Sequence, residues 1–208
     1  MPYYPVMLDL KGLPCLVVGG GQVAERKVLA LIECQAVVTV ISPEISPILR
    51  DLWERDVICW LERSFCAGDV GLYHLVVSAV NRPEINSVVA EECRQAKIPV
   101  NVVDDPPNCT FLLPAVLRRG ELVIAVSTGG ASPLVARHIR DELAQKYSSA
   151  YGEYLTLLAE ARDRVKQACV DPRRRREIFT ELTNGDLLNL VQAGRLDNAK
   201  EWVKRCLS

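Results

Sequence analysis

The sequence predicts an α/β protein: a Rossmann-type, doubly wound parallel sheet followed by one further strand and a C-terminal helical domain. Five apolar runs of strand length alternate with helical patterns or short loops, which is typical of a parallel sheet covered on both faces. A glycine-rich turn joins the first strand to the first helix. The later part of the chain is helical in pattern. We therefore expect three parts, residues 1–115, 116–147 and 148–208.

The expected elements of residues 1–115 follow a regular order. The strands are Cys15–Val18, Val37–Ile41, Val57–Trp60, His74–Ala79 and Val100–Val103. The clearest helices are Val23–Glu33, Ile45–Arg55 and Pro83–Ala96. Such sheets bind ligands beyond the carboxyl ends of their strands. The segments after these strands are therefore expected to converge on one binding site.

The pattern changes after Gly120. The apolar run Leu122–Val126 predicts a strand, and a helix is expected from Leu134 to about Lys146, with Ser132 as its N-cap and Pro133 as its first residue. The rest of the chain is read as helical. Breaks are expected at Gly152, Asp171-Pro172, Asn184-Gly185 and Gly194-Arg195.

Composition limits the functions open to this chain. Its 208 residues are 49% hydrophobic with a formal net charge of −1, which allows a proper core and argues against nucleic acid as a partner. No run of 18 apolar residues predicts a membrane span, and the N-terminal residues lack signal-peptide features, so we expect a cytoplasmic protein. The eight cysteines are scattered without a C-x-x-C pair. This favours buried thiols, and no metal site is expected.

The glycine-rich turn is the strongest functional signal. In the G-x-G-x-x-G/A pattern, Gly19 makes the tight turn, Gly21 lets the backbone approach a pyrophosphate, and Ala24 lets the helix pack on the strand. The N–H groups of the first helical turn, at Gln22 and Val23, would hold the phosphates. The alternative is a glycine turn that binds nothing.

The end of the second strand bears on the choice of coenzyme. Dinucleotide-binding folds usually place an acid there for the ribose hydroxyls. This strand is followed by Ser42, Pro43 and Glu44, so the acid is missing or displaced to Glu44, and the Ser42 hydroxyl can serve instead. No lysine or arginine lies between Ser42 and Arg50 to bind the 2′-phosphate of NADP. The sequence therefore favours NAD.

Three further segments carry candidate chemistry, each with a structural alternative. One of the adjacent residues Asp104 and Asp105 can act as a single general base, or both can cap the turn that follows. The loop Ser127–Pro133 can accept an anion at a helix N-terminus, or be a turn with a helix cap. The Arg173–Arg176 run is a solvated helix face or a surface that steers a polyanion.

Four stretches form a joint pattern: Pro5–Leu10, Val17–Lys27, Asn101–Asp104 and Val126–Arg137. In order and spacing they resemble the precorrin-2 dehydrogenase family, the N-terminal module of siroheme synthases. The resemblance covers about residues 1–145, and the helical tail fits only in length and character. Some members of the family are also sirohydrochlorin ferrochelatases.

The resemblance implies NAD-dependent oxidation of precorrin-2 to sirohydrochlorin, with Asp104 as the catalytic aspartate and Fe²⁺ as a candidate second substrate. It implies a homodimer with the strand Leu122–Val126 and the helical region at the interface. Because no apolar run is long enough to span a membrane, no membrane partner is expected. The resemblance also implies a substrate-binding loop and helix, which suit a tetrapyrrole rich in carboxylates. The residues concerned are Ser127, Thr128, Gly129, Gly130, Ser132 and Arg137.

The chain departs from the family pattern directly after Asp104, where Asp105, Pro106 and Pro107 follow. We expect the local backbone to differ from that of the family at this point. Two other functions stay open. One is a non-catalytic NAD-sensing module whose helical tail contacts a partner. The other is a chelatase that holds NAD only structurally.

Overall fold

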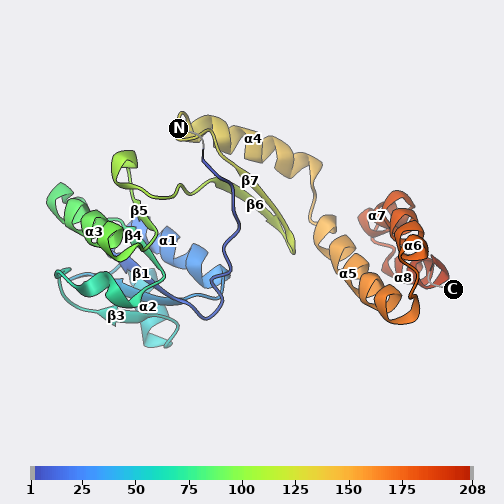
Figure 1. Cartoon of the computed structure of the whole chain (residues 1–208), viewed down its shortest axis with the longest axis horizontal. Coiled ribbons are helices and arrows are strands. Elements are labelled where there is room, and N and C mark those ends of the chain that lie inside the picture. Colours follow the sequence, from blue (N-terminus) through green and yellow to red (C-terminus); the bar gives the residue numbers. More distant parts are fainter. Residues whose placement is uncertain (1–2, 207–208) are drawn as a thin grey trace. The chain divides into compact units, whose positions relative to one another are not determined.

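The computed structural model describes residues 3–206. The chain divides into two compact units, with the boundary between Leu113 and Pro114. The first unit contains a five-stranded sheet and the second a two-stranded hairpin followed by helices (Figure 1). None of the described helices is long and apolar enough to cross a membrane.

The sheet of the first unit is parallel throughout, in the order β3-β2-β1-β4-β5. Its strands are β1 (Pro14–Val18), β2 (Val37–Ile41), β3 (Cys59–Leu61), β4 (Leu75–Ser78) and β5 (Val100–Val102). The chain runs outward from β1 to β3 and returns to the other side of β1 with β4. The predicted doubly wound sheet is therefore confirmed. Ligands of such folds bind at the point where the strand order reverses, beside the end of β1.

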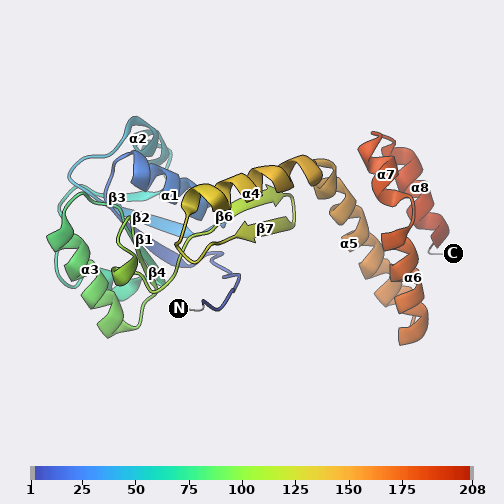
Figure 2. The same ribbon diagram turned by 90° about the horizontal axis from the view of Figure 1, so that it is seen from above.

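Helices cover both faces of this sheet (Figure 2). They are α1 (Gln22–Glu33), α2 (Pro47–Glu54) and α3 (Pro83–Ala96), with short 3₁₀ turns η1 (Asp69–Leu72) and η2 (Pro106–Asn108). Successive side chains of a strand point to opposite faces. Cys15 and Val17 of β1 accordingly pack in a core cluster with α1 and α2, whereas Leu16 and Val18 pack in a second cluster with α3. Burial on both faces explains why β1 is apolar without alternation.

The second unit begins with a hairpin of β6 (Ala115–Arg119) and β7 (Leu122–Val126), with Arg119 paired to Leu122. Only β7 was expected from the sequence. The strand β6 ends in two arginines and lacks the apolar run that identified the others. The residues of β6 form a strand because they pair with β7, and this pairing is not visible in the sequence of β6 itself. The helix α4 (Pro133–Lys146) packs against both strands.

The start of α4 is as predicted. The Ser132 hydroxyl accepts a hydrogen bond from the Val135 N–H at 3.3 Å, and Pro133 is the first helical residue. Both residue types favour these positions, because serine satisfies a free N–H and proline has none to lose.

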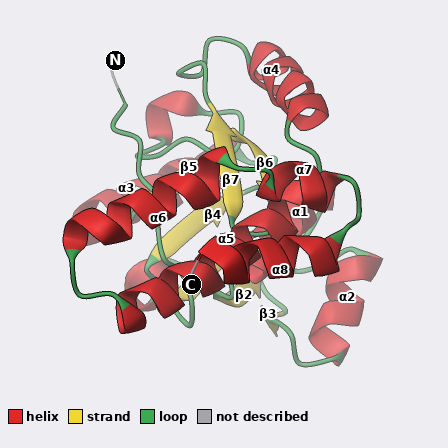
Figure 3. Cartoon of the chain, turned by 90° about the vertical axis from the view of Figure 1, so that its right-hand side faces the viewer, coloured by secondary structure: helices red, strands yellow, loops and turns green. Residues whose placement is uncertain are grey.

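Beyond α4 the described chain is helical (Figure 3). The helices are α5 (Ala150–Ala168), α6 (Pro172–Asn184), α7 (Leu187–Gln192) and α8 (Leu196–Cys206). They share a buried core that includes Ala161, Leu182 and Leu187. The breaks expected at Asp171-Pro172, Asn184-Gly185 and Gly194-Arg195 are confirmed.

The arginine run at the start of α6 is partly structural. The Arg175 guanidinium donates to the carbonyl oxygens of Cys169 at 2.6 Å and Lys166 at 3.0 Å, which satisfies acceptors at the end of α5. Arg174 forms an exposed ion pair with Glu177.

The break expected at Gly152 is wrong, because Gly152 lies within the first turn of α5. Its role is tertiary. A Cβ built on Gly120, in the β6–β7 turn, would lie 3.0 Å from the Gly152 Cα. Two glycines therefore allow the hairpin turn and the start of α5 to approach each other closely. Gly120 also has a φ of +59°, a left-handed conformation that favours glycine.

We expect Gly120→Ala to lower the free energy of unfolding by about 1–3 kcal/mol, because a left-handed residue with a side chain is strained and the new methyl presses on Gly152. Urea unfolding of the whole chain measures this. Gly194→Ala is the matched control, since Gly194 has a φ of +71° but nothing within 4 Å of its Cβ position. An equal loss in both variants would show that the contact with Gly152 contributes nothing.

Candidate coenzyme and catalytic site

The glycine-rich turn leaves β1 at the edge where parallel strands bind ligands. Gly19 has a φ of +115°, and a Cβ there would lie 2.5 Å from the Ala79 carbonyl oxygen. Gly21 is different, because no atom lies within 4 Å of its Cβ position. It is the N-cap of α1 and offers no side-chain cap to the helix. The turn therefore leaves open space beside the N-terminal N–H groups of α1, which suits a pyrophosphate.

The three predicted site residues in the first turn of α1 differ in burial. Ala24 is fully buried against β1, as its predicted packing role requires. Gln22 is exposed and Val23 half-buried. Coenzyme binding by Gln22 and Val23 stays a prediction.

The loop after β2 lies directly over the glycine-rich turn. The Ser46 N–H donates to the Gly20 carbonyl oxygen at 2.8 Å, and the Ser46 hydroxyl donates to the Glu25 carboxylate at 2.6 Å. A Cβ on Gly20 would collide with the Glu44 carbonyl oxygen. The structure thus brings the predicted residues Gly19, Gly21 and Glu44 into one region.

Sequence reasoning missed Gly20, Glu25 and Ser46 as parts of this region. The available signal was the third glycine of the turn, which the G-x-G-x-x-G/A pattern does not require. Glu25 falls in the stretch Val17–Lys27 of the family resemblance but was given no role, and Ser46 carried no signal. Their contact joins two segments far apart in the sequence, so the sequence does not reveal it.

Ser42 is buried at the end of β2, while Pro43 and Glu44 are exposed. The indole N–H of Trp60 donates to the Ser42 carbonyl oxygen at 2.9 Å. This bond fixes the backbone from which the Ser42 hydroxyl and the Glu44 carboxylate project. Their role at the coenzyme ribose stays a prediction.

The two aspartates after β5 have separate surroundings. Asp105 accepts a hydrogen bond from the Asn108 side chain at 2.8 Å, so it stabilises the turn before η2. Asp104 is exposed, and among residues 3–206 no hydrogen bond or ion pair engages its carboxylate. Its φ of +59° is a left-handed conformation that aspartate tolerates better than most residues. The alternative in which both aspartates cap the turn therefore fails for Asp104.

Lys27 of α1 lies close enough to Asp104 for their charges to interact. Burial lowers the pKa of the Lys27 ammonium, and the neighbouring Arg26 lowers it further, whereas Asp104 raises it. The arrangement places a half-buried cation near the free carboxylate. Lys27 falls in one of the four stretches of the family resemblance, but sequence reasoning gave it no role.

The Cys109 thiol links the residues on either side of Asp104. Its sulfur accepts the Val102 N–H at 3.2 Å, and the thiol lies 3.1 Å from the Val102 carbonyl oxygen and 3.3 Å from that of Asp105. Burial raises the pKa of this thiol, which keeps it protonated and able to donate at neutral pH. Cys109 thus fixes the turn that carries Asp104.

We expect Cys109→Ala to cost about 1–3 kcal/mol in the free energy of unfolding, because the Val102 N–H loses its acceptor. Urea unfolding tests this, with Cys109→Ser as the conservative variant that keeps a donor and an acceptor. If the alanine variant is as stable as the serine variant, the sulfur contacts do not fix the turn.

The polar groups of the Ser127–Pro133 loop largely bond to one another. The Thr128 hydroxyl accepts the Ser132 N–H at 3.0 Å, and the Ser127 hydroxyl accepts the Gly129 N–H at 3.1 Å. Gly129 and Gly130 both have positive φ values. Arg137 donates to the Pro133 carbonyl oxygen of its own helix at 3.3 Å. These contacts describe an ordered turn with a helix cap, and substrate binding by its residues stays a prediction.

No disulfide joins any of the cysteines within residues 3–206. Within the described part of the chain, no group of three or more histidine, cysteine, aspartate or glutamate residues is placed to hold a metal ion.

Comparison with known families gives three matches along the chain. Residues 6–115 match a family described as "Putative NAD(P)-binding". Residues 119–146 match the central region of sirohaem biosynthesis proteins, and residues 150–207 match the sirohaem synthase dimerisation region.

Individual proteins agree with these matches. The chain is 39% identical to a siroheme synthase of Methylococcus capsulatus over 200 residues, covering 96% of this chain and 42% of the relative. It is 41% identical to that of Thioalkalivibrio sulfidiphilus over 207 residues, covering 100% and 42%. The chain thus spans less than half the length of these relatives. The solved structure of SirC, a precorrin-2 dehydrogenase, is 28% identical with a TM-score of 0.78, covering 96% of this chain and 100% of SirC.

Proposed function

The chain belongs to the siroheme synthase family, and on that premise we propose that it catalyses the NAD-dependent oxidation of precorrin-2 to sirohydrochlorin. One observation carries the proposal. The free carboxylate of Asp104 and the open glycine-rich turn lie at the carboxyl edge of the same parallel sheet, where folds of this kind bind a dinucleotide.

The residues of the turn suit the coenzyme. The N–H groups at the start of α1 would hold the pyrophosphate, with Gly21 leaving room for it. The loop Ser42–Glu44 would hold the ribose, and it contains no cation for a 2′-phosphate, which favours NAD over NADP. When bound, NAD⁺ supplies the acceptor for a hydride.

Asp104 would act as the general base. Oxidation of precorrin-2 removes one hydride and one proton from the macrocycle, giving sirohydrochlorin, NADH and H⁺. The Asp104 carboxylate accepts no hydrogen bond from the described residues, so its lone pairs are available for that proton. The half-buried Lys27 side chain lies close enough to Asp104 for their charges to interact.

The second unit would serve the substrate and the assembly. We propose that Ser127, Thr128, Gly129, Gly130, Ser132 and Arg137 contact the carboxylates of the tetrapyrrole. A homodimer through β7 and the helices α5–α8 is supported by the match of residues 150–207 to a dimerisation region. The same matches support the division into residues 1–115, 116–147 and 148–208.

Anaerobic incubation with precorrin-2 and NAD⁺ tests the proposal, with NADH formation and the macrocycle spectrum as readouts. We expect NADH together with a sirohydrochlorin spectrum. Adding Fe²⁺ then tests iron insertion, which the family resemblance implies for some members. A further spectral change beyond the enzyme-free control would identify Fe²⁺ as a second substrate.

Two outcomes would contradict the proposal. NAD binding without any NADH formation would favour a non-catalytic sensor module. Iron insertion into sirohydrochlorin without oxidation of precorrin-2 would favour a chelatase that holds NAD structurally.

A further inference from the structure

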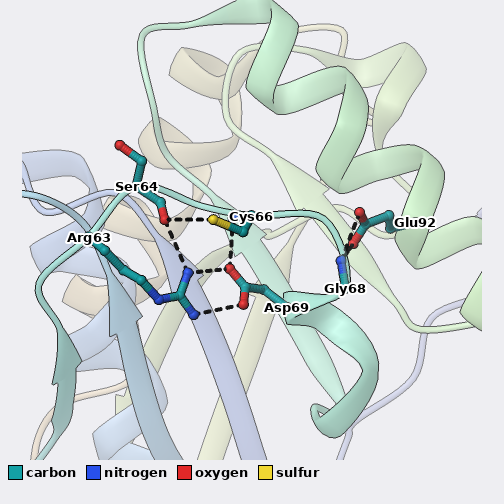
Figure 4. A network of polar contacts seen from close by, with 6 residues as sticks. All are labelled: Arg63, Ser64, Cys66, Gly68, Asp69 and Glu92. Carbon is teal, nitrogen blue, oxygen red and sulfur yellow. Dashed lines mark hydrogen bonds and ion pairs between the residues drawn. The ribbon is translucent and has the colours of Figure 1, made fainter.

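The loop after β3 contains an arginine that is held by a nearby carboxylate. The two terminal nitrogens of Arg63 lie 2.7 Å from the two carboxylate oxygens of Asp69, a bidentate pair (Figure 4). Asp69 also accepts the Cys66 N–H at 2.8 Å. Its side chain is 15% exposed, against 41% for Arg63. The hydrogen bonds from Arg63 hold the pKa of the Asp69 carboxyl below its usual range, so the pair is charged at neutral pH.

This loop lies beside the one predicted to hold the coenzyme ribose. The Leu61 carbonyl oxygen, at the end of β3, accepts the Ser42 N–H at 3.3 Å and the Arg63 N–H at 2.8 Å. Ser42 and Arg63 therefore leave the sheet side by side. An arginine near the ribose site is what dinucleotide-binding folds use to accept the 2′-phosphate of NADP.

We propose that Asp69 sets coenzyme specificity by holding the Arg63 guanidinium away from the ribose, so that the site discriminates against a 2′-phosphate. The inference rests on the proposed function, because it requires the coenzyme at this edge of the sheet. A guanidinium binds a phosphate through the same forked N–H groups that Asp69 occupies here. NADP must therefore compete with Asp69 for these N–H groups. Its apparent affinity is its intrinsic affinity multiplied by the fraction of molecules in which Arg63 is free.

A second cation lies in the same region. The Arg50 guanidinium is 5.2 Å from the centroid of the Trp60 ring, whose indole N–H bonds to Ser42. Among residues 3–206, no carboxylate holds Arg50 in a bidentate pair. A test of the proposal must therefore separate Arg63 from Arg50.

The test compares equilibrium binding of NAD⁺, NADP⁺ and 2′-phospho-ADP-ribose to the full chain by calorimetry. We expect Asp69→Asn to raise the affinity for both 2′-phosphorylated ligands about tenfold and to leave NAD⁺ affinity unchanged. Asparagine has the same shape and can still accept the Cys66 N–H. In the double variant Asp69→Asn, Arg63→Gln the gain should vanish.

Asp51→Asn is the matched control, because it removes a carboxylate from an exposed pair with Arg55 at the far end of α2. Asp51→Asn should leave the affinities for NAD⁺ and for both 2′-phosphorylated ligands unchanged. If Asp69→Asn does not fold, Asp69→Ser replaces it, since a hydroxyl can also accept the Cys66 N–H.

Several outcomes would overturn the inference. NADP⁺ affinity unchanged in Asp69→Asn would show that the pair does not control specificity. An equal gain for NAD⁺ would indicate a loosened loop, and a gain that survives Arg63→Gln would assign the 2′-phosphate to another cation such as Arg50. If the wild-type protein binds NAD⁺, the proposed coenzyme site stands, whatever the variants show about specificity. If the wild-type protein binds none of the three ligands, both the specificity proposal and the proposed function are overturned.

Discussion

Asp104→Asn is expected to lower the rate of precorrin-2 oxidation by about 10²–10⁴-fold, the usual contribution of a general base. The amide of asparagine cannot accept the proton. Among the described residues, no other carboxylate is hydrogen-bonded to Asp104, so none is in place to act instead. The fold should persist, because asparagine tolerates the left-handed φ of +59° as well as aspartate does. Anaerobic single-turnover measurements of NADH formation test the rate.

The control for this variant is Asp105→Asn. Asp105 holds the turn through Asn108, so its replacement should alter stability more than the chemical step. NAD affinity should be unchanged in both variants, because neither residue is placed in the glycine-rich turn. Near-normal turnover in Asp104→Asn would remove Asp104 from the mechanism.

The elements that the sequence predicted well are those with local causes. The strand β1 is buried on both faces, so its residues form an apolar run, and the glycines after it mark a turn. The cap of α4 is likewise local, because Ser132 and Pro133 act within one helical turn. Such features need no knowledge of the rest of the chain.

The features that escaped prediction depend on distant contacts. The strand β6 is defined by its pairing with β7, and its arginines hide it from a search for apolar runs. Gly152 lies within α5 and does not break it. The absence of a side chain there allows the turn at Gly120 to approach closely, a contact between segments distant in the sequence. Residue type and spacing alone do not separate Asp104 from Asp105, and only the family resemblance pointed to Asp104. They differ in the fold because Asn108 engages only one of them.

Gly21→Glu is expected to weaken NAD binding by more than about 100-fold while leaving the free energy of unfolding nearly unchanged. The two effects separate because Gly21 has open space at its Cβ position and a φ of −83° that any residue adopts. A glutamate there would place a negative charge where the pyrophosphate is expected, and opposed like charges cost several kcal/mol. Titration with NAD⁺ and urea unfolding measure the two quantities.

The neighbouring Gly19 gives the contrasting result, since a Cβ there meets the Ala79 carbonyl and its φ of +115° is strained for other residues. Gly19→Ala should therefore lower stability as well as NAD affinity. Gly71→Glu is the matched control, because Gly71 also has an open Cβ position but lies in η1. If Gly21→Glu binds NAD⁺ as tightly as Gly71→Glu, the pyrophosphate does not lie against this turn. If NAD⁺ affinity falls in Gly19→Ala, which also loses stability, but not in Gly21→Glu, the turn matters for folding and not for coenzyme binding.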